Sequence, residues 1–187
     1  MTSPHARKAL WTTKRVSRGT LCVRCALCLR RNCGRRQVIV MGLTSTGSLQ
    51  LQAGQVDVWL ASLSHVSNSE TFAYLQLLSE PEQAQWQRFK VKDARLQYLV
   101  TRALVRTTLS RYADVPAQTW QFETNAYGRP HISQPQASCN LRFNLSNTTG
   151  LVACAVSIDC EIGIDVENTT RTVDTDAVAP SVFAPAE

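Results

Sequence analysis

The sequence predicts a mixed fold of the α/β (α+β) class, and three observations lead to that prediction. Apolar side chains alternate with other residues in several short stretches, which is the period of half-buried strands. One long stretch carries its apolar residues at helical spacing. The chain has 187 residues, of which 44% are hydrophobic, so it is long and apolar enough to bury a core.

The first strand and the main helix are expected between residues 55 and 112. Apolar side chains alternate over residues 56–60, which predicts a strand. Ser79 is followed by Glu80, Pro81 and Glu82, a composition typical of a helix start. The helix is expected to continue, with room for one break, to about Tyr112, because an apolar stripe recurs at helical spacing over residues 96–104.

A tight turn and two further strands are expected next. After an extended segment, Asn125–Pro130 reads NAYGRP and predicts a turn with an arginine at its tip. Residues 141–145 alternate as a strand and run into a stretch of amides and hydroxyls, Asn144–Gly150. Such a stretch can bind phosphate oxygens, or it can be a polar turn between two strands. Both interpretations are open at this point, and residues 151–157 follow as an apolar strand.

The stretch Glu161–Glu167, reading EIGIDVE, is the most informative for function. Its isoleucines and valine alternate with the other residues, which predicts a half-buried strand. On such a strand the carboxylates of Asp165 and Glu167 project from the same side, roughly 7 Å apart along the backbone. Mg²⁺, which takes carboxylate oxygens, waters and substrate phosphates, would relieve their mutual repulsion. The alternative is a strand whose outer face is solvated acid. A short helix is expected later, around residues 177–183.

The first 52 residues differ in composition from the rest. Ten of the twenty Lys and Arg lie at or before Arg36, whereas the first acidic residue is Asp57. We expect a disordered basic segment, or upstream sequence if the true start is at Met41. A mitochondrial-type leader and a metal site are further alternatives, the latter because four cysteines lie close together. These cysteines are Cys22, Cys25, Cys28 and Cys33.

Several function classes are disfavoured by the sequence. It contains no run of about 18 apolar residues, so no membrane span is expected, and the lack of a secretory pattern near residues 21–29 favours a cytoplasmic location. Nucleic-acid binding fits poorly because the chain after Arg36 carries more acidic than basic residues. A hydrolase is disfavoured because His5, His65 and His131 lie in no recognisable nucleophile context.

Taken in order, four motifs resemble the Sfp-type 4′-phosphopantetheinyl transferases. They are the helix RFKVKDARLQYLVTRALVR at residues 88–106, the YGRP turn at 127–130, FNLSNTTG at 143–150 and IGIDVE at 162–167. The order and spacing of four separate motifs make this resemblance specific, and it covers about residues 55–187. It implies a pseudo-twofold fold of two similar α/β halves with the active site between them.

The resemblance also implies an activity and a set of site residues. These enzymes move the phosphopantetheine arm of coenzyme A to a serine of an apo acyl or peptidyl carrier protein, so both molecules are the implied partners. By resemblance, Asp165 and Glu167 would bind Mg²⁺, the implied cofactor. The implied coenzyme-binding residues are Gly128, Arg129, Asn144, Ser146, Asn147 and Asp165.

The chain departs from the family pattern in two ways. Asn147 stands where the family usually has histidine; asparagine can donate a hydrogen bond to a phosphate but carries no charge, so greater dependence on Arg129 and the metal is expected. The family's later helix, which supplies a third metal carboxylate and a group for proton transfer, has no counterpart. No catalytic base is therefore identifiable from the sequence.

The domain organisation follows from the same comparison of motifs. Residues 53–157 are expected to form the N-terminal half of a phosphopantetheinyl transferase, and residues 158–187 the truncated beginning of the second half. The alternative to an active enzyme is an inactive remnant that at most binds coenzyme A or a carrier protein. Apolar surface left uncovered by a missing half would favour self-association.

Overall fold

The computed structural model of the chain describes residues 21–24, 35–40, 49–64, 66–135 and 140–168. Within these residues, a four-stranded sheet forms the middle layer, in the order β2-β3-β7-β6. Only the β2–β3 pair is parallel. The strands are β2 (Arg35–Val40), β3 (Gln55–Ser62), β6 (Leu141–Thr148) and β7 (Leu151–Ile158).

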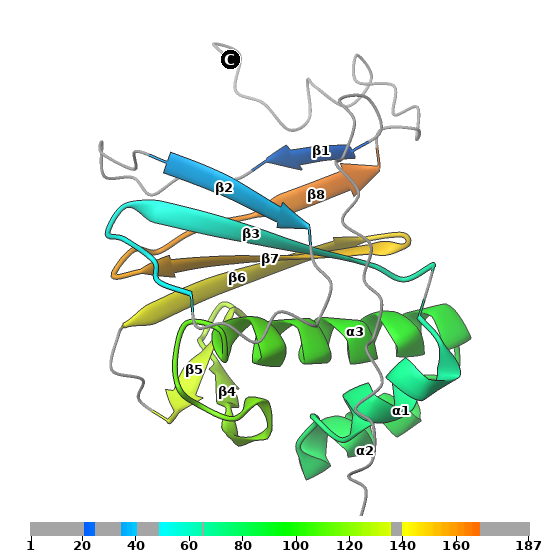
Figure 1. Cartoon of the computed structure of the whole chain (residues 1–187). Helices are drawn as coiled ribbons and strands as arrows, with labels where there is room; N and C mark the ends of the chain where they lie inside the picture. Colours follow the sequence, from blue (N-terminus) through cyan, green and yellow to red (C-terminus); the bar gives the residue numbers. More distant parts are fainter. Residues whose placement is uncertain (1–20, 25–34, 41–48, 65, 136–139, 169–187) are drawn as a thin grey trace, which may run out of the picture.

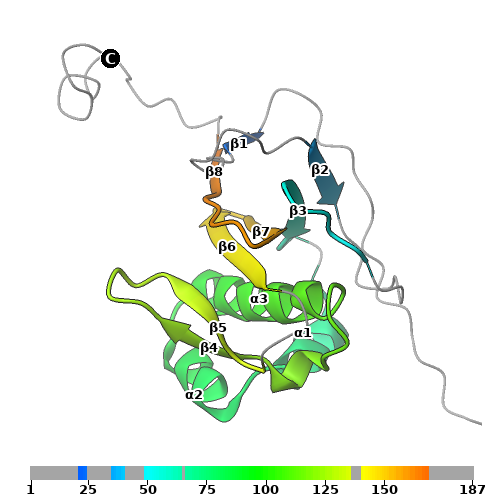
Figure 2. The same cartoon turned by 90° about the vertical axis from the view of Figure 1, so that its left-hand side faces the viewer.

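Helices cover one face of this sheet, and two short strands lie over the other (Figures 1 and 2). The long helix α3 crosses the first face, with α1, α2 and the β4–β5 hairpin beyond it. The helices are α1 (Asn68–Leu75), α2 (Glu80–Arg88), α3 (Lys92–Leu109) and the short 3₁₀ helix Ala117–Thr119. The antiparallel pairs are β4 (Gln121–Thr124) with β5 (Pro130–Gln134), and β1 (Leu21–Arg24) with β8 (Asp165–Asn168).

Capping boxes begin two of the helices. The Ser67 hydroxyl accepts a hydrogen bond from the Glu70 N–H at 3.2 Å, and the Glu70 carboxylate accepts one from the Ser67 N–H. At α2, the Ser79 N–H donates to the Glu82 carboxylate at 3.0 Å. These contacts satisfy backbone donors that a helix start leaves unpaired.

The two central strands β3 and β7 are buried on both faces. Between the sheet and α3 lies one apolar cluster, which includes Trp59, Leu99 and Phe143. On the opposite face the apolar side chains of β3 and β7 pack against the segment 162–166. The consequence is that this segment is held on the sheet by its own apolar residues, which are Ile162, Ile164 and Val166.

A buried polar network joins β3 to the segment that follows α3. The Trp59 indole N–H donates to the Tyr112 hydroxyl at 2.8 Å, and that hydroxyl donates to Asp57 at 2.8 Å. Asp57 also accepts from Gln55 at 3.0 Å. Burial, together with the hydrogen bond to Asp57, raises the pKa of Tyr112, so the phenol stays protonated and can act as the donor.

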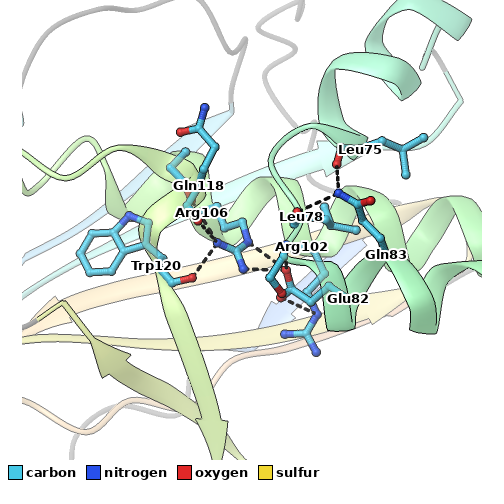
Figure 3. Close-up of polar contacts among 10 residues, drawn as sticks. Leu75, Leu78, Glu82, Gln83, Arg102, Arg106, Gln118 and Trp120 are labelled. Carbon is cyan, nitrogen blue, oxygen red and sulfur yellow. Dashed lines mark hydrogen bonds and ion pairs between the residues drawn. The ribbon is translucent and has the colours of Figure 1, made fainter.

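The Arg106 side chain, 1% exposed, fixes the packing of three elements (Figure 3). Its guanidinium donates to the Glu82 carboxylate at 2.6 and 3.1 Å, which links α3 to α2. It also donates to the backbone carbonyls of Ala117, Gln118 and Trp120 at 3.1, 3.4 and 2.7 Å. A buried charge is tolerable here because every side of the guanidinium finds an acceptor.

Several sequence predictions are confirmed by this fold. The strand over residues 56–60 lies inside β3, and after the N-cap Ser79 helix runs from Glu80 to Leu109 with one break at residues 89–91. The strands predicted at 141–145 and 151–157 are β6 and β7. None of the described helices is long and apolar enough to cross a membrane.

Other details differ from the prediction. The polar stretch after residue 143 is not a turn, because β6 continues to Thr148 and only Thr149 and Gly150 connect it to β7. The strand expected from Glu161 begins at Asp165. Helix α1 and strand β5 were not predicted, although Ser67-x-x-Glu70 is a capping-box pattern that signals a helix start.

Part of the N-terminal segment is described as strand. β1 and β2 fall within the first 52 residues, which we expected to be disordered, and the ladder of β1 includes Cys22. The other three cysteines of the proposed metal site lie outside the described residues, as does the helix expected around 177–183. The division into the domains 1–52, 53–157 and 158–187 stays a prediction.

Replacing Arg106 tests how much the fold depends on this buried side chain. Arg106→Met is expected to lower the free energy of unfolding by about 3 kcal/mol or more, because the Glu82 carboxylate loses its buried cationic partner and three carbonyls lose the hydrogen bond from Arg106. Urea denaturation measures this change. The control is Arg88→Met, since Arg88 is exposed at the end of α2, and its expected effect is within about 0.5 kcal/mol. Equal unfolding midpoints for the two variants would contradict the assignment.

Candidate functional site

The turn that carries Arg129 is built by the Asn125 side chain. Its carboxamide oxygen accepts hydrogen bonds from the N–H groups of Tyr127 and Arg129 at 2.9 and 3.0 Å. Gly128 completes the turn with φ of +77°, a conformation that favours glycine. Gly128 therefore shapes the turn. The backbone of Arg129 is held at the end of this turn, which connects β4 to β5.

Strand β6 sends alternate side chains to opposite faces. Leu141 and Phe143 are buried in the core beneath the sheet. Asn144 and Ser146 project to the other face, toward the segment that leads into β8. The alternation of the strand thus separates core residues from candidate site residues.

Ser146 ties β6 to the start of β8. Its hydroxyl donates to the Asp165 carboxylate at 3.1 Å, and it accepts a hydrogen bond from the Val166 N–H at 3.1 Å. Two residues that the sequence predicted separately are therefore in direct contact. This contact holds the Asp165 carboxylate beside β6.

The backbone carbonyl of Ile162 is a second meeting point. It accepts one hydrogen bond from the Arg129 guanidinium at 2.8 Å and another from the Asn144 side-chain amide at 3.0 Å. Arg129 and Asn144, which lie 33 and 18 positions from Ile162 in the sequence, thus both donate to its carbonyl oxygen. The structure brings Arg129, Asn144, Ser146 and Asp165 together around residues 162–166.

An ion-pair cluster lies next to this meeting point. The Glu161 carboxylate contacts the Arg129 guanidinium at 2.8 Å and the Arg142 guanidinium at 3.5 Å. These three residues line part of a cavity of about 260 Å³ between the hairpin and β6, together with Asn125 and His131 among others. Glu161 and Arg142 were not predicted as site residues, since nothing in their local sequence signals the contact.

Asn147 lies apart from the other predicted site residues. It is on the core-side face of β6, where its carboxamide oxygen accepts a hydrogen bond from the Gln97 side chain of α3. Both residues line a second groove, of about 380 Å³, together with Phe89 and Tyr98 among others. The structure therefore does not join Asn147 to the cluster at Asp165, and its role in binding stays a prediction.

The two predicted metal ligands occupy the exposed face of β8. Asp165 and Glu167 are exposed, whereas Val166 between them is 1% exposed. With the Ser146 hydroxyl, they offer only hard oxygen donors, which suits Mg²⁺. Among the described residues no group of three or more His, Cys, Asp or Glu could hold a metal ion. Two carboxylates are nevertheless compatible with Mg²⁺, which commonly keeps waters and substrate phosphates as its other ligands.

Cys154 is not a candidate nucleophile of this site. Cys154 lies in β7 and is fully buried, and this burial raises the pKa of its thiol. A buried thiol with a raised pKa is inert, because the thiolate is the reactive form. The candidate site residues named above offer cations, amides, a hydroxyl and carboxylates.

Two solved structures resemble the fold at low sequence identity. A holo-(acyl-carrier-protein) synthase from Bacillus anthracis, solved in complex with CoA (3′,5′-ADP), has a TM-score of 0.43 and 10% identity, covering 55% of this chain and 93% of its own. The Helicobacter pylori holo-[acyl-carrier-protein] synthase, in complex with coenzyme A, has a TM-score of 0.42 and 10% identity, covering 56% and 99%.

Curated relatives are more similar in sequence. The 4′-phosphopantetheinyl transferase HetI from Nostoc sp. is 30% identical over 140 residues, which are 75% of this chain and 59% of HetI. Sfp from Bacillus subtilis is 30% identical over 105 residues, covering 56% of this chain and 45% of Sfp. The transferase gsp from Aneurinibacillus migulanus is 31% identical over 103 residues, covering 55% and 39%. The chain thus spans about two to three fifths of these relatives' lengths.

The family described as "4′-phosphopantetheinyl transferase, N-terminal" matches residues 65–159. This match includes α1 to α3, the YGRP turn and the β6–β7 hairpin. It covers half of the chain, and the curated relatives bear the same family name. The chain therefore belongs to the 4′-phosphopantetheinyl transferase family and is of the Sfp type.

Proposed function

We propose that the chain binds coenzyme A and Mg²⁺ and takes part in transferring the 4′-phosphopantetheine arm to a serine of an apo carrier protein. In this reaction the serine oxygen forms a bond to the arm's phosphorus, the pyrophosphate P–O bond breaks, and adenosine 3′,5′-bisphosphate leaves. The observation that carries the proposal is the convergence of Arg129, Asn144, Ser146 and Asp165 around residues 162–166. The reaction itself is inferred from membership of the 4′-phosphopantetheinyl transferase family.

The donors of the site suit the phosphates of the coenzyme. Arg129 stands on a turn fixed by Asn125, and a guanidinium on a rigid turn can form paired hydrogen bonds to phosphate. Asn144 and Ser146 add an amide and a hydroxyl from the adjacent strand. These neutral donors orient phosphate oxygens without adding charge.

The carboxylates of the site suit the metal. Asp165 and Glu167 would hold Mg²⁺, with Ser146 fixing the Asp165 carboxylate through its hydroxyl. When bound, Mg²⁺ would neutralise the charge that develops on the pyrophosphate as its bond breaks. The proton of the carrier serine needs an acceptor, and none of the residues that we predicted supplies that role.

The proposed activity is tested by labelling a carrier protein. The chain is incubated with apo carrier protein and coenzyme A bearing a fluorescent arm, once with Mg²⁺ and once with EDTA. Labelling that requires Mg²⁺ is the expected result. An intact relative run in parallel verifies the carrier protein. Absence of labelling alongside an active relative would contradict turnover by this chain and favour the alternative, a protein that binds coenzyme A or carrier protein without transfer.

A substitution at Asp165 tests the metal site separately from turnover. Asp165→Asn is expected to weaken Mg²⁺-dependent binding of coenzyme A by tenfold or more, roughly the loss of one charged ligand. Isothermal titration calorimetry with and without Mg²⁺ measures this change. Asp159→Asn is a matched control, because Asp159 is exposed and adopts a φ of +55°, which asparagine tolerates. Equal Mg²⁺-dependent binding by both variants would remove Asp165 from the metal site.

Self-association stays part of the proposal. The large hydrophobic side chains exposed on the described residues are Phe72, Val91 and Tyr127. They lie on α1, just before α3 and on the turn. Because exposed apolar surface favours association, size-exclusion chromatography with light scattering is expected to find assemblies larger than 20.7 kDa. A monodisperse monomer at that mass would count against self-association.

A further inference from the structure

Arg129, the cation of the proposed coenzyme-binding site, already has an anionic partner. The Arg129 guanidinium uses one nitrogen for the Glu161 carboxylate at 2.8 Å and another for the Ile162 carbonyl at 2.8 Å. The Arg142 guanidinium reaches the second oxygen of Glu161 at 3.5 Å. Glu161 therefore already uses donors of both arginines that could otherwise bind a phosphate.

The ion pairs of Glu161 are of a kind that exchanges readily. The Glu161 side chain is 64% exposed, and the side chains of Arg129 and Arg142 are 32% and 40% exposed. Exposed ion pairs contribute little to stability and are screened by salt. A phosphate carrying more negative charge than a carboxylate can therefore take the place of Glu161.

Arg129 does not need Glu161 to keep its position. The Ile162 carbonyl still accepts its hydrogen bond, and the Asn144 side chain donates to the same carbonyl. The backbone of Arg129 is fixed independently by Asn125. Glu161 thus neutralises the guanidinium without being required to orient it.

We propose that Glu161 competes internally with a phosphate of coenzyme A for Arg129 and Arg142, and that it thereby sets the affinity of the proposed coenzyme-binding site. In the ligand-free chain, Glu161 bridges the two arginines beside the 260 Å³ cavity. On binding, the phosphate replaces the carboxylate, which turns toward solvent. This inference rests on the proposed binding of coenzyme A, and it adds Arg142 as a second cation of the site.

The test removes the charge of Glu161 while keeping its shape. Glu161→Gln and the unaltered chain are titrated by calorimetry with coenzyme A and with adenosine 3′,5′-bisphosphate, both in the presence of Mg²⁺. The variant is expected to bind each ligand about three- to tenfold more tightly. The phosphate then no longer has to replace an exposed ion pair or meet the repulsion of the Glu161 carboxylate. Equal or weaker binding by the variant would overturn the inference, since Glu161 would then be neutral or would help to orient Arg129.

Two controls separate competition from a general change in charge or shape. Glu123→Gln removes the same charge from an exposed position on β4, in the same hairpin as Arg129, and is expected to change affinity less than twofold. Adenosine, which has no phosphate, should bind the unaltered chain and Glu161→Gln equally. A similar gain with Glu123→Gln or with adenosine would overturn local competition for the phosphate.

The same titrations test the proposed binding of coenzyme A and the proposed role of Glu161 separately. If neither the unaltered chain nor Glu161→Gln binds coenzyme A, the proposed function fails, and this inference fails with it. If both bind with the same affinity, the proposed function stands and the inference alone fails. Thermal unfolding of the two proteins is expected to agree closely, because Glu161 is exposed and its replacement leaves no cavity.

Discussion

The register between β6 and β7 determines which side chains of β6 enter the core and which reach the candidate site. Thr148 pairs with Leu151 across a two-residue connection in which Gly150 has φ of +80°, a value that favours glycine. In this register Phe143 is buried and Asn144 is not. A shift by one residue would exchange the two faces, so a core constraint also positions the binding residues.

The opposite face of the sheet imposes the second constraint. Apolar residues of β3 and β7 bury Ile162, Ile164 and Val166, and the residues between them must then face outward. This packing exposes Asp165 and lets the Ser146 hydroxyl reach it. The carbonyl of Ile162 is fixed by the same packing, which explains how it can receive hydrogen bonds from both Arg129 and Asn144.

Local patterns predicted the parts of this arrangement that depend on neighbouring residues. The alternation within residues 161–167 correctly indicated that Asp165 and Glu167 share an exposed face, because burial on one side of a strand has a period of two. The start of α2 was predictable from Ser79 and the acids after it, since helix capping is local. The family motifs supplied Arg129, Asn144 and Ser146 as candidates.

Contacts between distant residues could not be predicted in this way. The pairing of Glu161 with Arg129 and Arg142 depends on how the hairpin lies against β6, and no local pattern encodes that placement. Asn147 was grouped with Ser146 because it stands where the family motif usually has histidine, yet adjacent residues of a strand face opposite sides. Extending β6 through the polar stretch, rather than ending it in a turn, is what separates them.

The measurement that tests the account most directly is an assigned ¹H–¹⁵N spectrum recorded as coenzyme A is added with Mg²⁺. The Val166 amide donates to the Ser146 hydroxyl, and the Leu145 amide donates to the Asn144 side chain at 2.7 Å. Both amides therefore report on the proposed site. The account predicts that the largest shifts occur at these amides and at Arg129, and that they require Mg²⁺. Shifts that leave all three unmoved while other elements respond would contradict it.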